Sequence, residues 1–204
     1  LSDDERQEVF DAFGPDPDMQ LYGRGLRRRL PPMLGGDGRR IRMAYSLLFS
    51  LPGTPVLFYG EEIGMGENLA LPDRLAVRTP MQWSDEPGAG FSTAGPDRLS
   101  RPLTEGAFGP LAVNVAAQRR DPDSLLNWFE RLIRRRRETP ELGLGTWAVI
   151  PNDEPGVLAH RCDWDCSTVV AVHNFGPEPC RLDLPLEGID DAVGADDLLD
   201  GSPE

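Results

Sequence analysis

Residues 50–64 read SLPGTPVLFYGEEIG, and this stretch decides the expected fold. Residues 56–59 are continuously apolar rather than alternating, which is typical of a parallel strand covered on both faces. A turn rich in Pro and Gly precedes them at 52–55, and a polar loop follows Gly60. A helix, a tight turn, a buried strand and a polar loop follow one another in this order in an α/β barrel, where the loops after the strands carry function. We therefore expect a central parallel strand at 56–59.

Two helices are predicted on the N-terminal side of this strand. The Ser2-x-x-Glu5 pattern is typical of a capping box and indicates a helix over 3–13. Asp37 can cap a second helix over 39–51, where apolar residues recur at helical spacing.

A third helix is predicted from Asp121 onward. Asp121 can cap it, Pro122 suits its first position, and Leu132 lies on its apolar face. Arginines fill positions 134–137, where the helix dipole favours cations. An anionic partner is the other interpretation of this basic run, but the net charge of −13 favours the dipole.

The hydrophobic period changes after Pro140 from that of helices to that of strands. Four strands are expected, at 146–150, 157–161, 168–175 and 180–186. They predict a small antiparallel β domain, and 190–204 is expected to be a loop or a loose tail.

Composition excludes several classes of function. The 204 residues include 34 acids against 21 bases, which argues against a nucleic-acid partner. The sequence lacks the run of ~18 apolar residues that a membrane-spanning helix needs. Three cysteines are an odd number and do not describe a disulfide scaffold, so a reducing cytoplasm is the expected location. The acidic start without Met reads as an internal cut rather than a secretory signal.

Recognisable catalytic or metal-binding motifs are scarce. Phosphate-binding glycine patterns, a Gly-x-Ser-x-Gly motif and a His/Cys ligand set are all missing from the sequence. His160 and His173 fall in predicted strands, where a general base lacks a cleft, so both are interpreted as structural. Cys162 and Cys166 are interpreted as buried or incidental thiols rather than metal ligands.

The loop after the predicted strand concentrates polar side chains. These are Glu61, Glu62, Glu67, Asp73, Arg74, Arg78, Gln82 and Trp83. Carboxylates and guanidiniums make paired hydrogen bonds to sugar hydroxyls, and an indole face packs against the C–H side of a sugar ring. The alternative is that the acids pair with the arginines and hold the loop. The arginines at 24 and 27–29 are likewise interpreted as a solvated face or as partners of nearby acids.

Several longer segments resemble a known family. Residues 50–68 resemble the eighth barrel strand and following loop of α-amylase-superfamily glycoside hydrolases. Residues 77–84, VRTPMQWS, are similar to a segment shared by α-glucosidases, oligo-1,6-glucosidases and trehalose synthases. Residues 25–30, 112–115 and 121–128 look most like the trehalose synthases, which are maltose α-D-glucosyltransferases. The resemblance covers nearly all of residues 1–140.

The resemblance implies an α/β fold class. Residues 1–139 would be the C-terminal fragment of a (β/α)8 TIM barrel, and residues 140–204 a small, truncated antiparallel β-sandwich. The implied activity of the full-length parent is interconversion of maltose and trehalose by intramolecular glucosyl transfer with retention, which needs two carboxylates flanking the bond. The family's three catalytic carboxylates lie on strands four, five and seven, the last in an Asn-His-Asp motif that this sequence lacks. No catalytic residue is therefore assigned, and the chain alone is expected to be inactive.

Substrate-binding residues can be carried over in the matched segment. The resemblance implies that Arg78 contacts the glucose unit at the −1 subsite, near the exit of the 56–59 strand. Asp73 and Gln82 are further substrate-binding candidates. Glu61 and Glu62 match the strand-eight segment and not the acid/base residue.

The resemblance also bears on cofactors and partners. It implies no cofactor and no metal ligand in this chain, and it leaves calcium open for the full-length parent. The implied partners are maltose, trehalose or other α-glucosides, together with the missing N-terminal part of the parent's own barrel. An oligomer is left open.

Three alternatives stay open at this point. The parent could be a retaining α-glucosidase that hydrolyses oligosaccharides. The β domain could be a carbohydrate-binding or interaction module, since Trp147 and Trp164 offer ring platforms. The parent could also have lost its activity.

Overall fold

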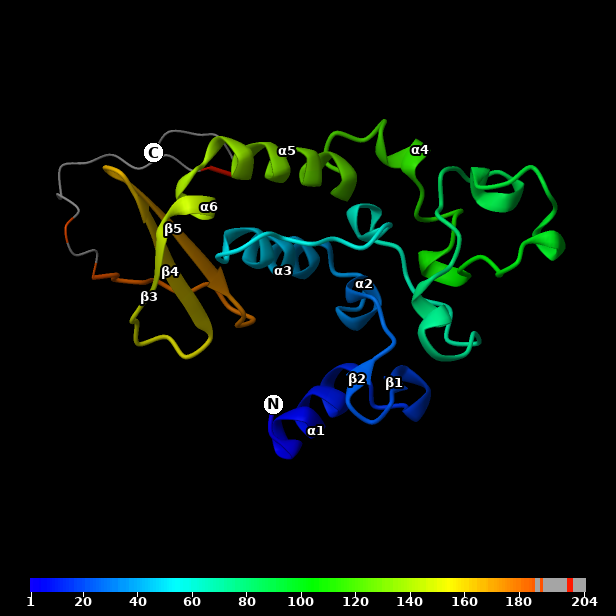
Figure 1. Cartoon of the computed structure of the whole chain (residues 1–204), viewed down its shortest axis with the longest axis horizontal. Coiled ribbons are helices and arrows are strands. Elements are labelled where there is room, and N and C mark those ends of the chain that lie inside the picture. The colour runs from blue at the N-terminus through cyan, green and yellow to red at the C-terminus, as the bar shows by residue number, and fades with distance from the viewer. Residues whose placement is uncertain (186–187, 189–197, 200–204) are drawn as a thin grey trace. The chain divides into compact units, whose positions relative to one another are not determined.

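The N-terminal helix begins where its capping box predicts. In the computed structural model, which describes residues 1–185, 188 and 198–199, helix α1 spans Asp3–Phe13 (Figure 1). The Ser2 hydroxyl accepts a hydrogen bond from the Glu5 amide, and the Glu5 carboxylate accepts one from the Ser2 amide at 2.7 Å. Two of the free N–H groups of the first turn are thereby satisfied, so the prediction for 3–13 is confirmed.

The chain divides into two compact units. The first unit comprises Leu1–Arg42 and Leu57–Phe129, and the second comprises Met43–Val56 and Glu130–Glu204. Two of the three boundaries fall inside helices, α3 (Gly38–Ser50) and α5 (Leu125–Glu138), and the third follows Val56. The expected division at 139/140 follows the domains of a parent enzyme and stays a prediction.

The first unit consists of short elements joined by irregular chain. A two-residue antiparallel pair, β1 (Gln20–Leu21) with β2 (Gly25–Leu26), follows η1 (Pro17–Met19). Helix α2 (Leu30–Met33) and the start of α3 (Gly38–Ser50) come next. The long loop then carries η2 (Glu61–Ile63), η3 (Asp73–Val77), η4 (Pro87–Gly90), η5 (Pro96–Arg98), η6 (Gly106–Phe108) and α4 (Val115–Gln118). Short helical turns and side-chain hydrogen bonds, rather than sheets, order this region.

The second predicted helix is confirmed as α3. The Asp37 carboxylate accepts hydrogen bonds from the amides of Arg39 and Arg40, which is how an acidic cap satisfies a first turn. Those two bonds hold the pKa of Asp37 below its ordinary value. The helix places Tyr45 and Phe49 on its buried face, four residues apart.

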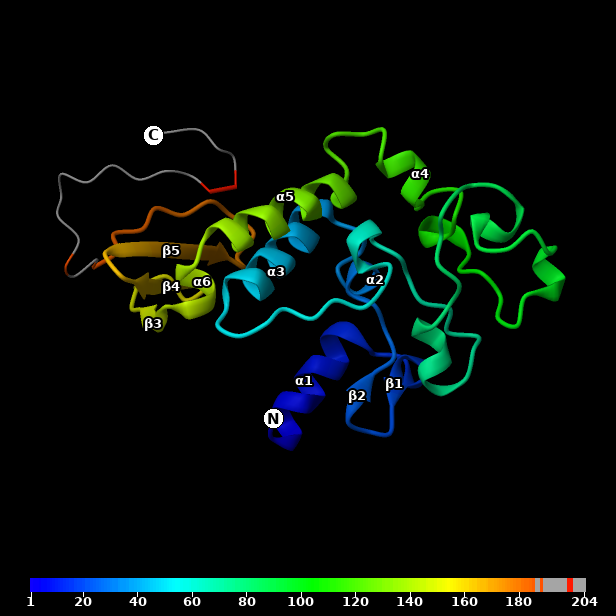
Figure 2. The same cartoon turned by 45° about the horizontal axis from the view of Figure 1, so that its top comes forward.

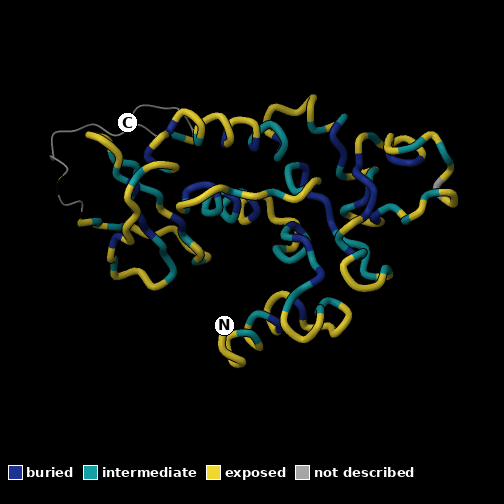
Figure 3. The backbone as a smooth tube through the Cα atoms, viewed as in Figure 1, coloured by how far each residue is buried: buried dark blue, intermediate teal, exposed yellow. Residues whose placement is uncertain are grey.

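The predicted strand at 56–59 is wrong for this chain. Its residues form no strand, and the tube through this segment is coloured mostly as exposed (Figure 3). Val56 is 80% exposed, and Phe58 and Tyr59 are exposed by 40% and 41%. A parallel strand exists only through hydrogen bonds to neighbouring strands. No segment within residues 1–185 pairs with 56–59, so its apolar side chains stay uncovered.

A left-handed turn follows this segment and leads into the small core of the first unit. Gly60 has φ +85°, and a Cβ there would collide with the Met65 side chain, so glycine fits the position. The Met65 amide closes the turn onto the Gly60 carbonyl at 2.9 Å. The core beyond it contains Ile63, Met65, Met81 and Val115.

Helix α5 starts later than predicted and spans Leu125–Glu138. The Asp121 carboxylate binds the Asp123 amide and closes a turn, and the Ser124 hydroxyl accepts the amide of Asn127 as the actual cap. Ser124, and not Asp121, is the N-cap because its backbone carbonyl also accepts the first i to i+4 hydrogen bond of the helix, from the Trp128 amide at 3.0 Å. Leu132 is buried as predicted.

The second unit contains a three-stranded antiparallel sheet (Figure 2). After α6 (Glu141–Leu144), strands β3 (Thr146–Ile150), β4 (Val157–Trp164) and β5 (Ser167–Asn174) follow in the order β3-β4-β5. A two-residue turn joins β4 to β5, with Asp165 at φ +55°. Three of the four predicted strands are confirmed, with β4 extending to Trp164.

The fourth predicted strand is not formed over its described residues 180–185, and residue 186 lies outside them. A second sheet of a sandwich is therefore not seen in the described part of the chain. The predicted tail at 190–204 lies outside the described residues except for 198–199, which form a turn.

Both histidines are structural, as predicted. His160 and His173 are buried on neighbouring strands with their rings stacked 6.0 Å apart. The His160 Nε2 lies 3.1 Å from the Ser50 carbonyl oxygen, and the His173 Nε2 lies 3.1 Å from the Ser46 hydroxyl. Burial lowers the pKa of both rings, and His160 adds to the effect at His173, whose pKa falls to about 4.

The helices of the described residues are all too short or too polar to cross a lipid bilayer.

Candidate substrate-binding site

The three predicted substrate-binding residues fall in different environments. Asp73 opens η3 and Arg78 follows its end, and both are exposed. Gln82 is completely buried. Within the described residues no hydrogen bond or ion pair joins any two of these three side chains. The structure therefore keeps Asp73 and Arg78 available to a ligand and places Gln82 in the interior.

Gln82 holds two segments of the long loop together. Its amide nitrogen donates to the carbonyl oxygens of Phe108, at 3.1 Å, and Val113, at 2.5 Å. Its own backbone carbonyl accepts the amide of Val115 at 3.0 Å. Both side-chain N–H groups are thus used inside the protein, so Gln82 supports the loop in this chain and has no donor left for a sugar.

Arg78 has the opposite character. It is exposed, and within the described residues its guanidinium makes no hydrogen bond or ion pair. A guanidinium carries five N–H donors in a fixed plane, which suits pairs of neighbouring oxygen atoms. Arg78 is therefore the side chain of the matched segment that is best prepared to bind a hydroxylated ligand.

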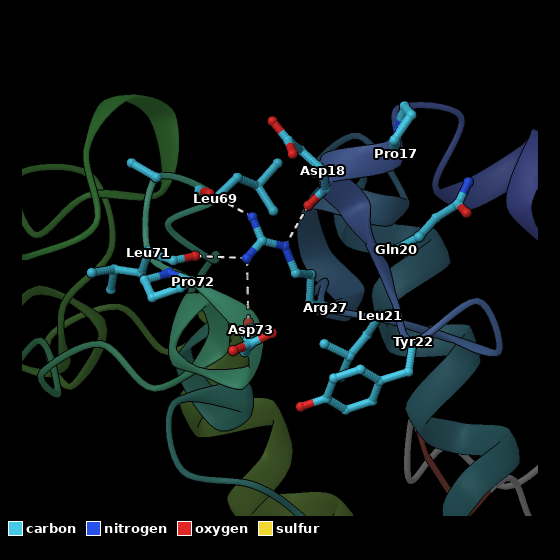
Figure 4. A pocket seen from close by; sticks show the side chains of 11 residues that line it. Pro17, Asp18, Gln20, Leu21, Tyr22, Arg27, Leu69, Leu71, Pro72 and Asp73 are labelled. Atoms are coloured by element: carbon cyan, nitrogen blue, oxygen red, sulfur yellow. Dashed lines mark hydrogen bonds between the residues drawn. The ribbon is translucent and has the colours of Figure 1, made fainter.

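Asp73 borders an open hollow of about 480 Å³ on the first unit (Figure 4). The residues around it are Pro17, Asp18, Gln20, Leu21, Tyr22, Arg27, Leu69, Ala70, Leu71, Pro72 and Asp73. Asp73 has φ +48° and Tyr22 has φ +54°, so two residues on its rim adopt the uncommon left-handed conformation. The Asp73 carboxylate is exposed and can accept hydrogen bonds.

Arg27 lies at the hollow but is not available to a ligand. Its guanidinium donates to the carbonyl oxygens of Asp18, Leu69, Leu71 and Asp73, and Figure 4 shows these bonds radiating from one group. The residue is only 8% exposed. Arg27 therefore fastens the loop at 69–73 to η1.

The arginine run at 27–29 corrects one interpretation and confirms another. Arg27 and Arg29 are buried and donate to backbone carbonyls, so they do not form a solvated face. Arg28 does pair with an acid, because its Nε lies 2.9 Å from the Glu67 carboxylate. The second oxygen of Glu67 accepts the Arg29 amide at 2.9 Å. Glu67 is therefore a structural acid, as the loop-holding alternative expected.

Glu61 is also structural. Its carboxylate accepts the Phe58 amide at 3.0 Å, and burial raises its pKa above the ordinary value.

Among the described residues no three His, Cys, Asp or Glu side chains come together as a metal site.

Sequence reasoning missed the side chains that bind the backbone next to Arg78. Arg29 donates to the carbonyls of Tyr59 and Val77, at 3.0 and 2.8 Å, and lies 5.1 Å from the Phe58 ring centroid. The Tyr59 hydroxyl donates to the Thr79 carbonyl at 2.7 Å. Tyr59, at the end of the 56–59 segment, is thereby bonded to the backbone of Thr79, next to Arg78. The contact of Arg78 with a glucose unit stays a prediction. The sequence pointed to these contacts only through its run of adjacent arginines, and residue spacing does not show which carbonyls an arginine binds.

Residues 27–145 match the family described as alpha amylase, catalytic domain. The match covers more than half of the chain, and the chain therefore belongs to this family. Among its relatives, "Trehalose synthase" of Pimelobacter sp. (strain R48) is 40% identical over 191 residues, covering 90% of this chain and 33% of the relative. "Trehalose synthase/amylase TreS" of Mycobacterium tuberculosis is 42% identical over 190 residues, covering 90% of this chain and 31% of the relative.

Solved structures agree with this membership. A variant of the trehalulose synthase MutB superposes with a TM-score of 0.66 at 26% identity, over 84% of this chain and 36% of that one. The alpha-amylase from H. orenii superposes with a TM-score of 0.56 at 31% identity, over 72% of this chain and 28% of that one. The chain spans about a third of the length of these two trehalose synthases. It corresponds to a fragment of a TIM-barrel-type fold, which explains why residues 56–59 find no neighbouring strand here.

Proposed function

We propose that this chain is the closing segment of the catalytic barrel of a maltose-to-trehalose glucosyltransferase. Trehalose synthases at 40–42% identity along about 90% of the chain support the assignment. The observation that carries it is the exposed Arg78 guanidinium, free of partners within the described residues and set in the matched VRTPMQWS segment.

The chemistry divides between this chain and the rest of the parent enzyme. Retaining transfer needs a nucleophilic carboxylate and an acid/base carboxylate on either side of the glucosidic bond. This chain lacks the Asn-His-Asp motif that carries one of the family's three carboxylates, so the reacting acids belong to other parts of the parent. The role of the present residues is to bind and orient the glucose unit.

Arg78 and Asp73 supply that binding. A guanidinium donates to neighbouring hydroxyl oxygens, and a carboxylate accepts from hydroxyl hydrogens, so the pair complements a sugar edge. Gln82 acts indirectly, because both of its N–H groups are already bound to carbonyls. Holding glucose tightly while its anomeric carbon is activated is what allows rejoining to a second glucose instead of hydrolysis.

The intracellular setting is part of the same proposal. All three cysteines are free, and Cys166 and Cys180 are exposed, which suits the reducing cytoplasm.

Product analysis tests the proposed function. The full-length parent is incubated with maltose, and its products are separated by chromatography. Formation of trehalose with little glucose is expected. Release of glucose alone would replace the proposal with a retaining α-glucosidase, a function supported by the more distant similarity to an oligo-1,6-glucosidase of Bacillus cereus at 25% identity. Binding of maltose by residues 140–204 alone would favour the carbohydrate-binding module.

A further inference from the structure

Three successive backbone carbonyls around Arg78 each receive a side-chain hydrogen bond. Arg29 donates to the Val77 oxygen at 2.8 Å, and Arg101 donates to the Arg78 oxygen at 3.0 Å. Tyr59 donates to the Thr79 oxygen at 2.7 Å. The residues that provide the bonds lie 48, 23 and 20 positions away along the chain.

Other contacts hold the same three residues from inside. The Arg78 amide donates to the Leu75 carbonyl at 3.0 Å and ends η3. The Thr79 hydroxyl lies 3.1 Å from the Thr104 hydroxyl, and both threonines are buried. The carbonyl oxygens of residues 77–79 and the Arg78 amide are therefore all hydrogen-bonded. The Arg78 guanidinium itself stays exposed and makes no hydrogen bond or ion pair within the described residues.

We infer that Arg29, Tyr59 and Arg101 are positioning residues that aim the Arg78 side chain at the bound glucose unit. The inference rests on the proposed function, since it gives Arg78 its ligand. None of the three is placed in contact with substrate. They act on the carbonyls of residues 77–79.

The physical reason is preorganisation. A long arginine side chain loses rotamer freedom when it binds, and a mobile backbone would add to that cost. Fixing the peptide groups on both sides of Arg78 restricts the direction of its Cα–Cβ bond before substrate arrives. An arginine held in this way loses less entropy on binding, and a small change of direction would be felt at the reacting bond.

Tyr59→Phe is the sharpest variant, because it removes one hydroxyl and leaves the ring in place. In the full-length parent acting on maltose, kcat/KM is expected to fall about 2- to 10-fold, the range that one neutral hydrogen bond is worth. Tyr45→Phe, which removes a hydroxyl in the second unit, is the control and should keep the parent's kinetics.

A double-mutant cycle distinguishes positioning from general stabilisation. If Tyr59 acts through Arg78, Tyr59→Phe has no further effect on kcat/KM in an Arg78→Ala background. An effect of the same size in both backgrounds would overturn the inference. Arg101→Ala should behave like Tyr59→Phe, and Arg98→Ala, on the same loop with an exposed side chain, should leave kcat/KM unchanged.

Hydrogen exchange decides the matter independently of the proposed function. The peptide spanning 75–81 should exchange faster in Tyr59→Phe than in the parent or in Tyr45→Phe. Unchanged exchange would overturn the inference whatever the kinetics show. If Arg78→Ala itself keeps full activity, the proposed substrate role of Arg78 fails, and the exchange result alone then judges whether the three residues fix the backbone.

Discussion

At the scale of single residues, Arg78 and Gln82 show how neighbours in one motif can differ in role. Four positions along the chain lead from an exposed guanidinium, unpaired within the described residues, to a completely buried amide. The matched segment suggested both as ligands for sugar. Burial and the hydrogen bonds of Gln82 assign it to the loop instead, because an amide with both N–H groups engaged has none left for a substrate.

Arg78→Ala should weaken binding of the glucose unit without unfolding the protein. The side chain is exposed and makes no bond within the described residues, so its loss removes no internal contact. In the full-length parent, KM for maltose should rise about tenfold or more, as expected for losing a charged hydrogen-bond donor. Steady-state kinetics with a melting curve measure both effects. Kinetics equal to the parent's would remove Arg78 from the site.

Gln82→Ala should instead lower stability. It leaves the carbonyl oxygens of Phe108 and Val113 without their donor, at a cost of about 1–3 kcal/mol in the free energy of unfolding. Urea denaturation measures this cost. Gln7→Ala, which removes a surface amide bonded to Asp11, is the control and should change stability by less than about 0.5 kcal/mol. Equal effects of the two variants would contradict the loop-holding role.

At the scale of elements, local signals predicted the helices well. The capping box placed α1, and Asp37 placed α3, because caps act within three or four residues. The start of α5 was missed by three positions, since Asp121 and Ser124 can both cap and only the chain's path decides between them. The strand at 56–59 was wrong because strand formation depends on partners that spacing does not report.

Leu132→Ala should destabilise the second unit by about 2–5 kcal/mol as a core truncation in α5. Leu132 is 6% exposed, whereas its neighbour Ile133 is 40% exposed. Ile133→Ala is therefore the matched control, with an expected loss well under half as large. Thermal unfolding of both variants checks the buried face of the helix, and similar losses would show that this face is misassigned.

The stacked histidine pair should make the second unit sensitive to acid. The folded-state pKa of His173 is about 4, below its ordinary value of 6.5, so below pH 6.5 the unfolded chain binds a proton that the folded sheet rejects. Stability should therefore be constant above about pH 7 and fall as the pH drops from 6.5 toward 4, by about 2–3 kcal/mol for His173.

Unfolding followed by tryptophan fluorescence between pH 4 and 8 measures this dependence. Trp147 reports on the pair, because its ring lies 5.8 Å from that of His160. His173→Gln should flatten the curve between pH 6.5 and 4. A curve that keeps its full slope in this variant would assign the acid sensitivity to other groups.

At the scale of the whole molecule, residues 1–185 contain the proposed substrate-binding segment but not a complete barrel. The chain alone should therefore not convert maltose. Val56, Phe58 and Tyr59 remain uncovered, and contiguous apolar residues of this kind promote association. Incubation with maltose followed by chromatography, with the full-length parent as positive control, checks the absence of activity. Trehalose or glucose formed by the isolated chain would refute it.

The sequence predicted only those parts of the candidate site that depend on the types of residue present. Exposed Arg78 and Asp73 follow from a polar loop after an apolar segment. The hydrogen bonds of Arg29, Tyr59 and Arg101 do not, because they join residues 20 to 48 positions apart and end on backbone oxygens, which any residue provides. Arg27 and Arg29 illustrate the same limit, since an arginine run looks equally polar whether it meets water or carbonyls.

Because Arg27 is buried, chemical labelling of arginines can report local opening of the loop that it holds. Dicarbonyl reagents such as phenylglyoxal attack guanidinium groups that solvent can reach, so Arg78 is open to them while Arg27 is shielded. Arg27 can react only after its bonds to the carbonyls at 69–73 have broken. The ratio of adducts at Arg27 to adducts at Arg78, measured by mass spectrometry, therefore reports how often this loop opens locally while the rest of the protein stays folded.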